Sequence, residues 1–190
     1  MTMKKYHASH VASALCLLVI VFSSSSFGAS GSIGLEKFFG KYAGRSISVQ
    51  GEGLSDRDFN VTISAYAKNG FTLDWTTVIR YTSGKTKQTT SSVNFLPFRK
   101  RPGIFYSAME KNIFGKQAPA DPLSGKPYVW AGIEKDTLTV TALYIVNDGG
   151  YELQVFKRTL TPSGMTTHFE RVRNGEKLRI ITGKLEKIAN

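Results

Sequence analysis

The stretch Gly70–Thr82, GFTLDWTTVIRYT, determines how the rest of the chain is interpreted. Apolar or aromatic residues take every second position over most of its length, and mainly polar residues take the positions between them. The apolar set consists of Phe71, Leu73, Trp75, Ile79 and Tyr81. Successive side chains of a β-strand point to opposite faces of the sheet. This two-residue rhythm therefore predicts a strand with one buried face.

The same rhythm continues on both sides of this stretch and predicts a series of antiparallel strands. Pairs such as Asn69-Gly70, Ser83-Gly84 and Asn174-Gly175 separate the runs, because asparagine and glycine readily adopt the backbone conformation of tight hairpin turns. The predicted strands are Gly44–Gln50, Asp58–Ala67, Gly70–Thr82, Lys87–Phe98, Gly103–Met109, Lys126–Glu134, Asp136–Val146, Gly150–Thr161, Gly164–Arg173 and Glu176–Lys187.

So many short strands are expected to close into a barrel or to fold into a sandwich, rather than to form one flat sheet. The last five, from Lys126 to Lys187, follow one another as uninterrupted hairpins. This favours an all-β fold with a single antiparallel up-and-down β-barrel over a Greek-key sandwich. The long connection Glu110–Gly125 has no alternating pattern. We interpret it as a loop that closes one end of the barrel, or as a lid.

The N-terminal residues have a different pattern. Lys4 and Lys5 precede an uncharged apolar run, Val11–Phe22, and small residues follow up to Gly31. These three parts are typical of a secretory signal peptide, and the run is shorter than the roughly 20 residues of a membrane-spanning helix. We therefore expect residues 1–30 to be a cleaved signal peptide and residues 31–190 to be one barrel domain of a periplasmic or secreted protein. An uncleaved membrane anchor is the alternative.

The small number of cysteine and histidine residues limits the kinds of active site and metal site that this domain can have. The only cysteine, Cys16, lies inside the predicted signal peptide, as do His7 and His10. His168 alone remains, which excludes a cysteine nucleophile and a multi-histidine metal site. We interpret His168 as a solvated residue on a polar strand face. We predict no catalytic residues, no metal and no cofactor, and we favour binding over catalysis.

The chain is strongly basic, with a formal net charge of +11. Such a charge favours anionic partners, and in an exported protein these are lipid or polysaccharide rather than nucleic acid. The densest basic cluster, Arg99, Lys100 and Arg101, falls at a predicted turn, where it either binds an anionic surface or is merely solvated. A second cluster on neighbouring strands is expected to form one patch. It comprises Lys157, Arg158, Arg171 and Arg173.

Aromatic residues make up 12% of the chain. Large rings fill a barrel core or line a cavity inside it, and a barrel of about eight strands or more can hold a small ligand. We expect the ligand-binding residues to be Tyr42, Trp75, Phe105, Trp130 and Tyr144.

The segment Gly40–Gly44, GKYAG, resembles the G-x-W motif that opens the first strand of lipocalins and related calycin barrels. In those proteins the aromatic ring closes one end of the barrel and a late-strand arginine packs over it. The resemblance implies that Tyr42 replaces the tryptophan and that Arg173 or Arg179 supplies the arginine. It also implies a barrel that binds a small apolar or amphipathic molecule.

Three functional hypotheses follow. The first is an exported β-barrel that holds a small apolar or amphipathic ligand. The second is a basic interaction module that binds anionic envelope lipid or polysaccharide. The third is a carboxylate-dependent hydrolase, which needs two acids on either side of a cleft, with Asp74 and Glu134 as the candidates.

Overall fold

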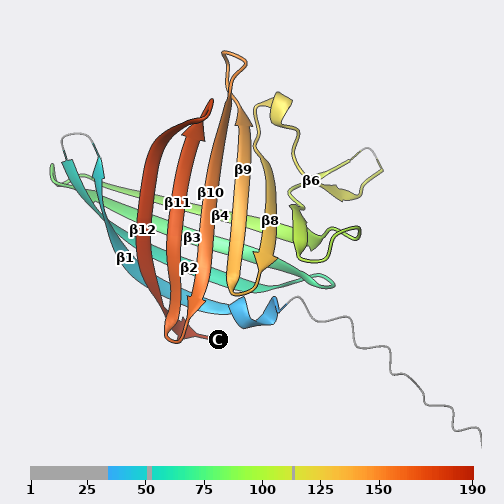
Figure 1. Cartoon of the computed structure of the whole chain (residues 1–190), viewed down its shortest axis with the longest axis horizontal. Helices are drawn as coiled ribbons and strands as arrows, with labels where there is room; N and C mark the ends of the chain where they lie inside the picture. The colour runs from blue at the N-terminus through green and yellow to red at the C-terminus, as the bar shows by residue number, and fades with distance from the viewer. Residues whose placement is uncertain (1–33, 51–52, 113) are drawn as a thin grey trace, which may run out of the picture. The chain divides into compact units, whose positions relative to one another are not determined.

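The computed structural model describes residues 34–50, 53–112 and 114–190, so the predicted signal peptide lies outside the described residues. Within these ranges the fold is all β apart from two short 3-10 helices, η1 (Glu36–Phe38) and η2 (Pro122–Ser124). Ten antiparallel strands form a closed up-and-down barrel, which confirms the predicted fold class (Figure 1). The barrel strands are β1 (Gly40–Gln50), β2 (Gly53–Tyr66), β3 (Gly70–Tyr81), β4 (Thr86–Pro97), β5 (Ile104–Ser107), β8 (Tyr128–Glu134), β9 (Thr137–Ile145), β10 (Tyr151–Thr161), β11 (Gly164–Arg173) and β12 (Glu176–Ala189).

Strands that are consecutive in the chain are neighbours in the barrel, and β1 pairs with β12 to close it. The one long connection lies between β5 and β8, which pair with each other. It contains η2 and a short hairpin, β6 (Glu110–Lys111) and β7 (Gln117–Ala118). The sequence did not predict this hairpin, because two-residue strands are too short to show an alternating pattern.

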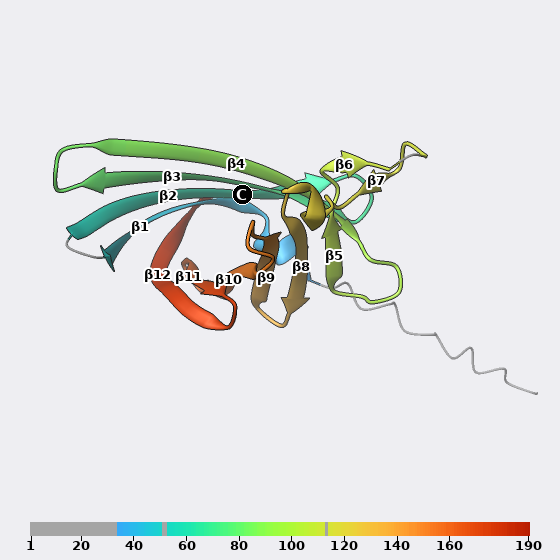
Figure 2. The ribbon, with the colours of Figure 1, turned by 90° about the horizontal axis from the view of Figure 1, so that it is seen from above.

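The barrel strands run in two main directions. Figure 1 shows β1–β4 crossing β8–β12 at a steep angle, so that two curved sheets face each other across the interior. In Figure 2 the hairpin of β3 and β4 extends beyond β10–β12. The tip of this hairpin, from Tyr81 to Thr86, is exposed.

One end of the barrel interior, which we call the packed end, is filled by apolar side chains. The rings of Phe71 and Phe95 are stacked with centroids 4.7 Å apart, and Phe105 meets Phe71 edge-on at 5.2 Å. All three are fully buried, and burying a side chain of this size contributes about 1.5–3 kcal/mol. The surrounding buried residues include Phe38, Tyr42, Ile63, Leu73, Ala131, Leu138 and Met165.

The helix η1 covers the packed end, below the strands in Figure 1. Phe38 is fully buried there, and the hydroxyl of Tyr42 donates a hydrogen bond of 2.9 Å to its carbonyl oxygen. Burial raises the pKa of the Tyr42 hydroxyl, so the group remains a donor. An ion pair of 2.7 Å between Lys37 Nζ and Asp136 Oδ1 joins η1 to the turn between β8 and β9.

Both glycines of the GKYAG segment are required by the backbone. Gly40 has a φ of +141°, a conformation that residues with a side chain rarely adopt. A Cβ on Gly44 would collide with the carbonyl oxygen of Lys184 on β12. The first strand can therefore bend closely against the last strand where the barrel closes.

The cation beside the Tyr42 ring is a lysine. Lys187 Nζ lies 5.9 Å from the ring centroid. Neither arginine that the resemblance suggested occupies this place: Arg173 forms an ion pair of 2.8 Å with Asp148, and Arg179 lines a cavity.

Candidate functional site

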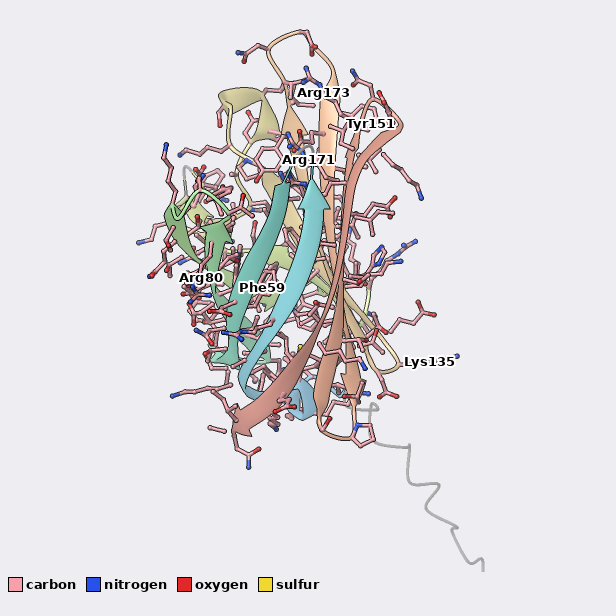
Figure 3. The ribbon with its side chains drawn as sticks, turned by 90° about the vertical axis from the view of Figure 1, so that its left-hand side faces the viewer. Phe59, Arg80, Lys135, Tyr151, Arg171 and Arg173 are labelled. Carbon is pink, nitrogen blue, oxygen red and sulfur yellow. The ribbon has the colours of Figure 1, made fainter. Side chains whose placement is uncertain are left out.

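The interior beyond the packed end contains a cavity of about 520 Å³ between β2–β4 and β10–β12, which we call the arginine cavity. Its volume lies within the range of about 300–1,000 Å³ that is usual for ligand sites. Its aromatic lining consists of Phe59, Trp75, Phe156 and Phe169. Its arginines are Arg57, Arg158, Arg171 and Arg179. Figure 3 labels Phe59 and Arg171 and shows Arg171 near one end of the barrel, with Lys135 near the other.

A smaller space of about 220 Å³, which we call the apolar compartment, adjoins the arginine cavity. The two share Trp75, Gln154, Phe156 and Arg158 as lining residues. Most other residues around the smaller space are apolar, among them Leu73, Val93, Val129, Val140 and Ala142. Arg158 therefore stands at the junction of a polar space and an apolar one.

Strand register brings the arginines together. Gln154 and Phe156 of β10 pair with Arg171 and Phe169 of β11, and Arg171 pairs in turn with Arg179 of β12. Paired residues point to the same face of the sheet, so these side chains all face the interior.

The basic patch predicted from Lys157, Arg158, Arg171 and Arg173 is formed only in part. Lys157, Arg158 and Arg171 all border the arginine cavity, although Lys157 is exposed and its strand neighbour Arg158 is buried. Arg173 is not in this lining, because it lies exposed at the end of β11 and pairs with Asp148 at 2.8 Å.

Glu152 balances one of the cavity arginines. Arg171 Nη2 donates to Glu152 Oε2 at 2.6 Å, and Gln154 Nε2 donates to Glu152 Oε1 at 2.8 Å. The hydrogen bond from Arg171 is the main reason that the pKa of Glu152 is lowered. Both carboxylate oxygens are thus engaged. No carboxylate is among the described residues that line the arginine cavity or the apolar compartment.

Arg158 has no such partner. It is 6% exposed, and its Nε and Nη1 atoms form no hydrogen bond within the described ranges. Burial lowers the pKa of its guanidinium to about 10. A lowered pKa is expected when a cation is removed from water and the surrounding groups do not fully replace its hydration. The guanidinium carbon lies 5.8 Å from the centroid of the Phe156 ring, a cation–π contact that offsets part of this cost.

Unsatisfied nitrogen atoms are concentrated in this cavity. In the part of the chain that the structure describes, the buried side-chain atoms without a hydrogen-bond partner are two nitrogens of Arg158, Nε of Arg171, Nε of Arg179 and the hydroxyl of Ser107. All but the hydroxyl belong to arginines of the arginine cavity. Buried polar groups are normally satisfied, so such a cluster calls for a functional explanation.

The charges of these arginines act on one another. Burial lowers the pKa of Arg179, and the nearby charges of Arg57 and Arg171 lower it further. Burial also lowers the pKa of Arg57. The arginine cavity therefore presents hydrogen-bond donors and positive charge beside aromatic surface, a combination suited to a molecule with both acidic and apolar parts.

The structure separates the five predicted ligand-binding residues into three environments. Trp75 lines both spaces, and Tyr144 lines the apolar compartment. Tyr42 and Phe105 belong to the packed end. Trp130 lies on the outer face of β8, because its neighbours in the strand on either side face the core, and its ring is 5.8 Å from that of a tyrosine two residues away.

The predicted surface cluster Arg99, Lys100 and Arg101 lies in the exposed turn between β4 and β5. His168 is half-buried on the outer face of β11, with Nε2 3.9 Å from Glu170 Oε2. It borders a groove of about 650 Å³ on the outer face of β1 and β10–β12. The cations of this groove are Arg45, Lys157 and Lys184.

The two candidate acids of the hydrolase hypothesis lie on different strands that are not adjacent. Asp74 is on the outer face of β3, opposite in direction to Trp75, and Glu134 is exposed at the end of β8. Among the described residues, no group of histidine, cysteine or acidic side chains has the arrangement of a metal site. The described helices are also too short to cross a bilayer.

The function of this chain has to be inferred from the geometry of the arginine cavity. Neither the protein-family models nor the curated proteins give a match to this chain.

Proposed function

We propose that this protein is an exported ligand-binding β-barrel that holds one small apolar or amphipathic molecule. The observation that supports it is the pair of adjoining spaces, about 520 and 220 Å³, inside a barrel whose other end is filled by the packed end and η1. A barrel serving only as a scaffold has no need for an interior of this size, since protein cores are normally filled.

Aromatic side chains provide the apolar part of this site. Phe59 and Trp75 approach from one sheet, and Phe156 and Phe169 approach from the other, with 4.7 Å between the last two ring centroids. A molecule held between them is removed from water on both sides, and each Å² of apolar surface buried in this way contributes about 25 cal/mol.

Native mass spectrometry of the protein purified without denaturation tests this proposal. We expect a co-purifying mass on the folded protein that is lost on unfolding. Trp75→Ala should reduce its occupancy, and Trp130→Phe, which changes a ring on the outer face, should leave it unchanged. A protein that never carries a ligand, and that binds no apolar or amphipathic compound when these are added, would contradict the proposal.

Export is tested separately. The proposal requires a mature N-terminus close to residue 30 in the periplasmic or secreted fraction, which N-terminal sequencing would detect. Retention of residues 1–30 on protein from that fraction would contradict cleavage and favour an anchor.

The groove on the outer face supports a second candidate function, the binding of anionic envelope lipid or polysaccharide. Arg45, Lys157 and Lys184 lie around it. Co-sedimentation with anionic and neutral vesicles distinguishes the two candidates. The second predicts binding to anionic vesicles only, lost at about 0.5 M salt because exposed charges are then screened. It also predicts that Lys157→Met and Lys184→Met weaken binding, whereas Arg158→Met does not.

A further inference from the structure

The unsatisfied arginine nitrogens of the arginine cavity specify the ligand more closely than its volume does. Nε and Nη1 of Arg158, which is 6% exposed, have no partner within the described ranges, and both spaces meet at this side chain. We propose that the ligand carries an oxyanion headgroup, a carboxylate or a phosphate, that binds Arg158 at the junction of the arginine cavity and the apolar compartment. This inference rests on the proposed ligand-binding function.

We infer an anionic headgroup because no carboxylate is among the described residues that line the arginine cavity or the apolar compartment. Arginine offers only donors, and its planar fork matches the paired oxygens of a carboxylate or phosphate. Glu152, the acidic partner of a neighbouring cavity arginine, is already bound to Arg171 at 2.6 Å and to Gln154 at 2.8 Å. A ligand oxyanion would supply the counter-charge that the described lining residues do not provide.

Burial places the headgroup inside the barrel rather than at its mouth. Arg171 is 40% exposed at its side chain and already has an acidic partner, whereas Arg158 is buried and has no acidic partner among the described side chains. Truncating one partner of a buried charged hydrogen-bonding pair is far costlier than removing an exposed charge. Binding energy for the anion is therefore concentrated at Arg158, while the outer arginines attract it electrostatically.

The apolar body of the ligand has space on both sides of this headgroup. On one side the apolar compartment presents Leu73, Val93 and Val140. On the other side Phe59 and Phe169 line the larger space. The ligand class is thus an amphiphile with an acidic headgroup and an apolar part that can extend into either space, in contact with aromatic rings.

Tryptophan fluorescence can report binding directly. The chain has two tryptophans, and Trp130 lies on the outer face, so the Trp130→Phe protein reports on Trp75 in the lining of both spaces. We would titrate this protein with dodecanoate and dodecyl phosphate below their critical micelle concentrations, and with dodecanol below its solubility limit. We expect at least one of the two anionic chains to bind about 10-fold or more tightly than the neutral alcohol, and the tighter of the two identifies the headgroup.

A buried arginine of β10 and an exposed lysine of β1 supply the variant and its control. Arg158→Met removes the buried cation and should weaken binding of the preferred anionic chain by about 30-fold, the lower end of the cost of truncating a buried charged partner, with little effect on dodecanol. Lys41→Met removes the same charge from an exposed position that lines neither of the two spaces nor the outer groove. It should leave all affinities within about 2-fold, because an exposed charge contributes little.

The outcomes separate this inference from the function on which it rests. Equal affinity for all three chains, or an Arg158→Met protein that keeps the preference for anions, would overturn the headgroup assignment and leave the ligand-binding function standing. Binding of none of the three would count against both. If Arg158→Met does not fold, the headgroup assignment is still tested by the protein with native Arg158. That protein must bind an anionic chain more tightly than dodecanol.

Discussion

Two pairs of phenylalanine rings have the same spacing but occupy opposite parts of the barrel interior. Phe71 and Phe95 at the packed end, and Phe156 and Phe169 in the arginine cavity, each have centroids 4.7 Å apart. The first pair is fully buried among other apolar side chains. The second borders open space and lies beside the guanidinium of Arg158, two of whose nitrogens have no hydrogen-bond partner among the described residues.

The difference shows how one closed sheet can serve two purposes. At the packed end the buried inward positions are mainly apolar, so that region stabilises the fold. In the arginine cavity, rings and arginines follow each other at inward positions of β10 and β11, and part of the stabilisation is given up for a binding surface. Sites that depart from good packing or leave polar groups unsatisfied are commonly the functional ones.

The largest expected effect contrasts the two ring pairs directly. Phe95→Ala should lower the free energy of unfolding by about 3–5 kcal/mol, because it leaves a cavity among fully buried rings. Phe169→Ala should cost roughly half as much, since its ring already adjoins open space. Denaturant unfolding monitored by circular dichroism measures both. Equal losses would mean that the arginine cavity is as tightly packed as the other end.

A gain of stability is expected for Arg158→Met in the absence of ligand. Replacing a buried, unpartnered cation by an apolar side chain of similar length should raise the free energy of unfolding by about 1–3 kcal/mol, since unsatisfied buried charge is costly. Lys157→Met, at an exposed position of the same strand, is the control and should change stability little. A clear loss of stability in Arg158→Met would show that the protein itself satisfies this charge.

The ion pair between Glu152 and Arg171 should make the free energy of unfolding depend on pH. The native pKa of Glu152 is lowered, so its carboxylate stabilises the fold above its unfolded-state pKa and loses that effect as the pH falls from about 4.5 through the native pKa. Glu152→Gln should cost about 1–2 kcal/mol at pH 7, because Arg171 is partly exposed, and progressively less at lower pH.

The acid dependence is measured by unfolding at several values between pH 7 and pH 3. Glu134→Gln, an exposed acid at the end of β8, is the matched control and should leave the profile nearly unchanged. If Glu152→Gln lost the same free energy at pH 3 as at pH 7, ionisation of this carboxyl would not be the cause.

The smallest effect is expected at the exposed turn between β4 and β5. Replacing Arg99, Lys100 and Arg101 together by glutamine should not measurably change the melting temperature or the affinity for an amphiphile, because this turn is remote from the interior contacts. A large loss of ligand affinity in this variant would move the binding site to the surface.

Most of the fold could be predicted from the sequence because its determinants are local. Alternation decides which face of a strand is buried, and turn residues decide where hairpins reverse. Thus the predicted strand Gly164–Arg173 coincides with β11. The β6–β7 hairpin was missed because neither strand is long enough to show a pattern.

The arginine cavity was missed for a different reason. Trp75 and Tyr144 were predicted as lining residues because large rings suggest an interior position, but Arg158 and Arg171 were treated as part of a basic patch. The alternation of Phe156 with Arg158, and of Phe169 with Arg171, places each arginine on the same face as a ring, and this signal was present in the sequence. What the sequence does not contain is the spacing of the two facing sheets in the closed barrel, which determines whether these faces enclose a space or a packed core.

The central claim is that Arg158 is retained for binding at the expense of stability, and melting temperatures test it most directly. Wild type and Arg158→Met would be compared without ligand and with saturating amounts of the preferred anionic chain, either dodecanoate or dodecyl phosphate. We predict that the variant melts higher without ligand and that wild type gains more on ligand addition. A variant that gains as much as wild type from the ligand would contradict the claim.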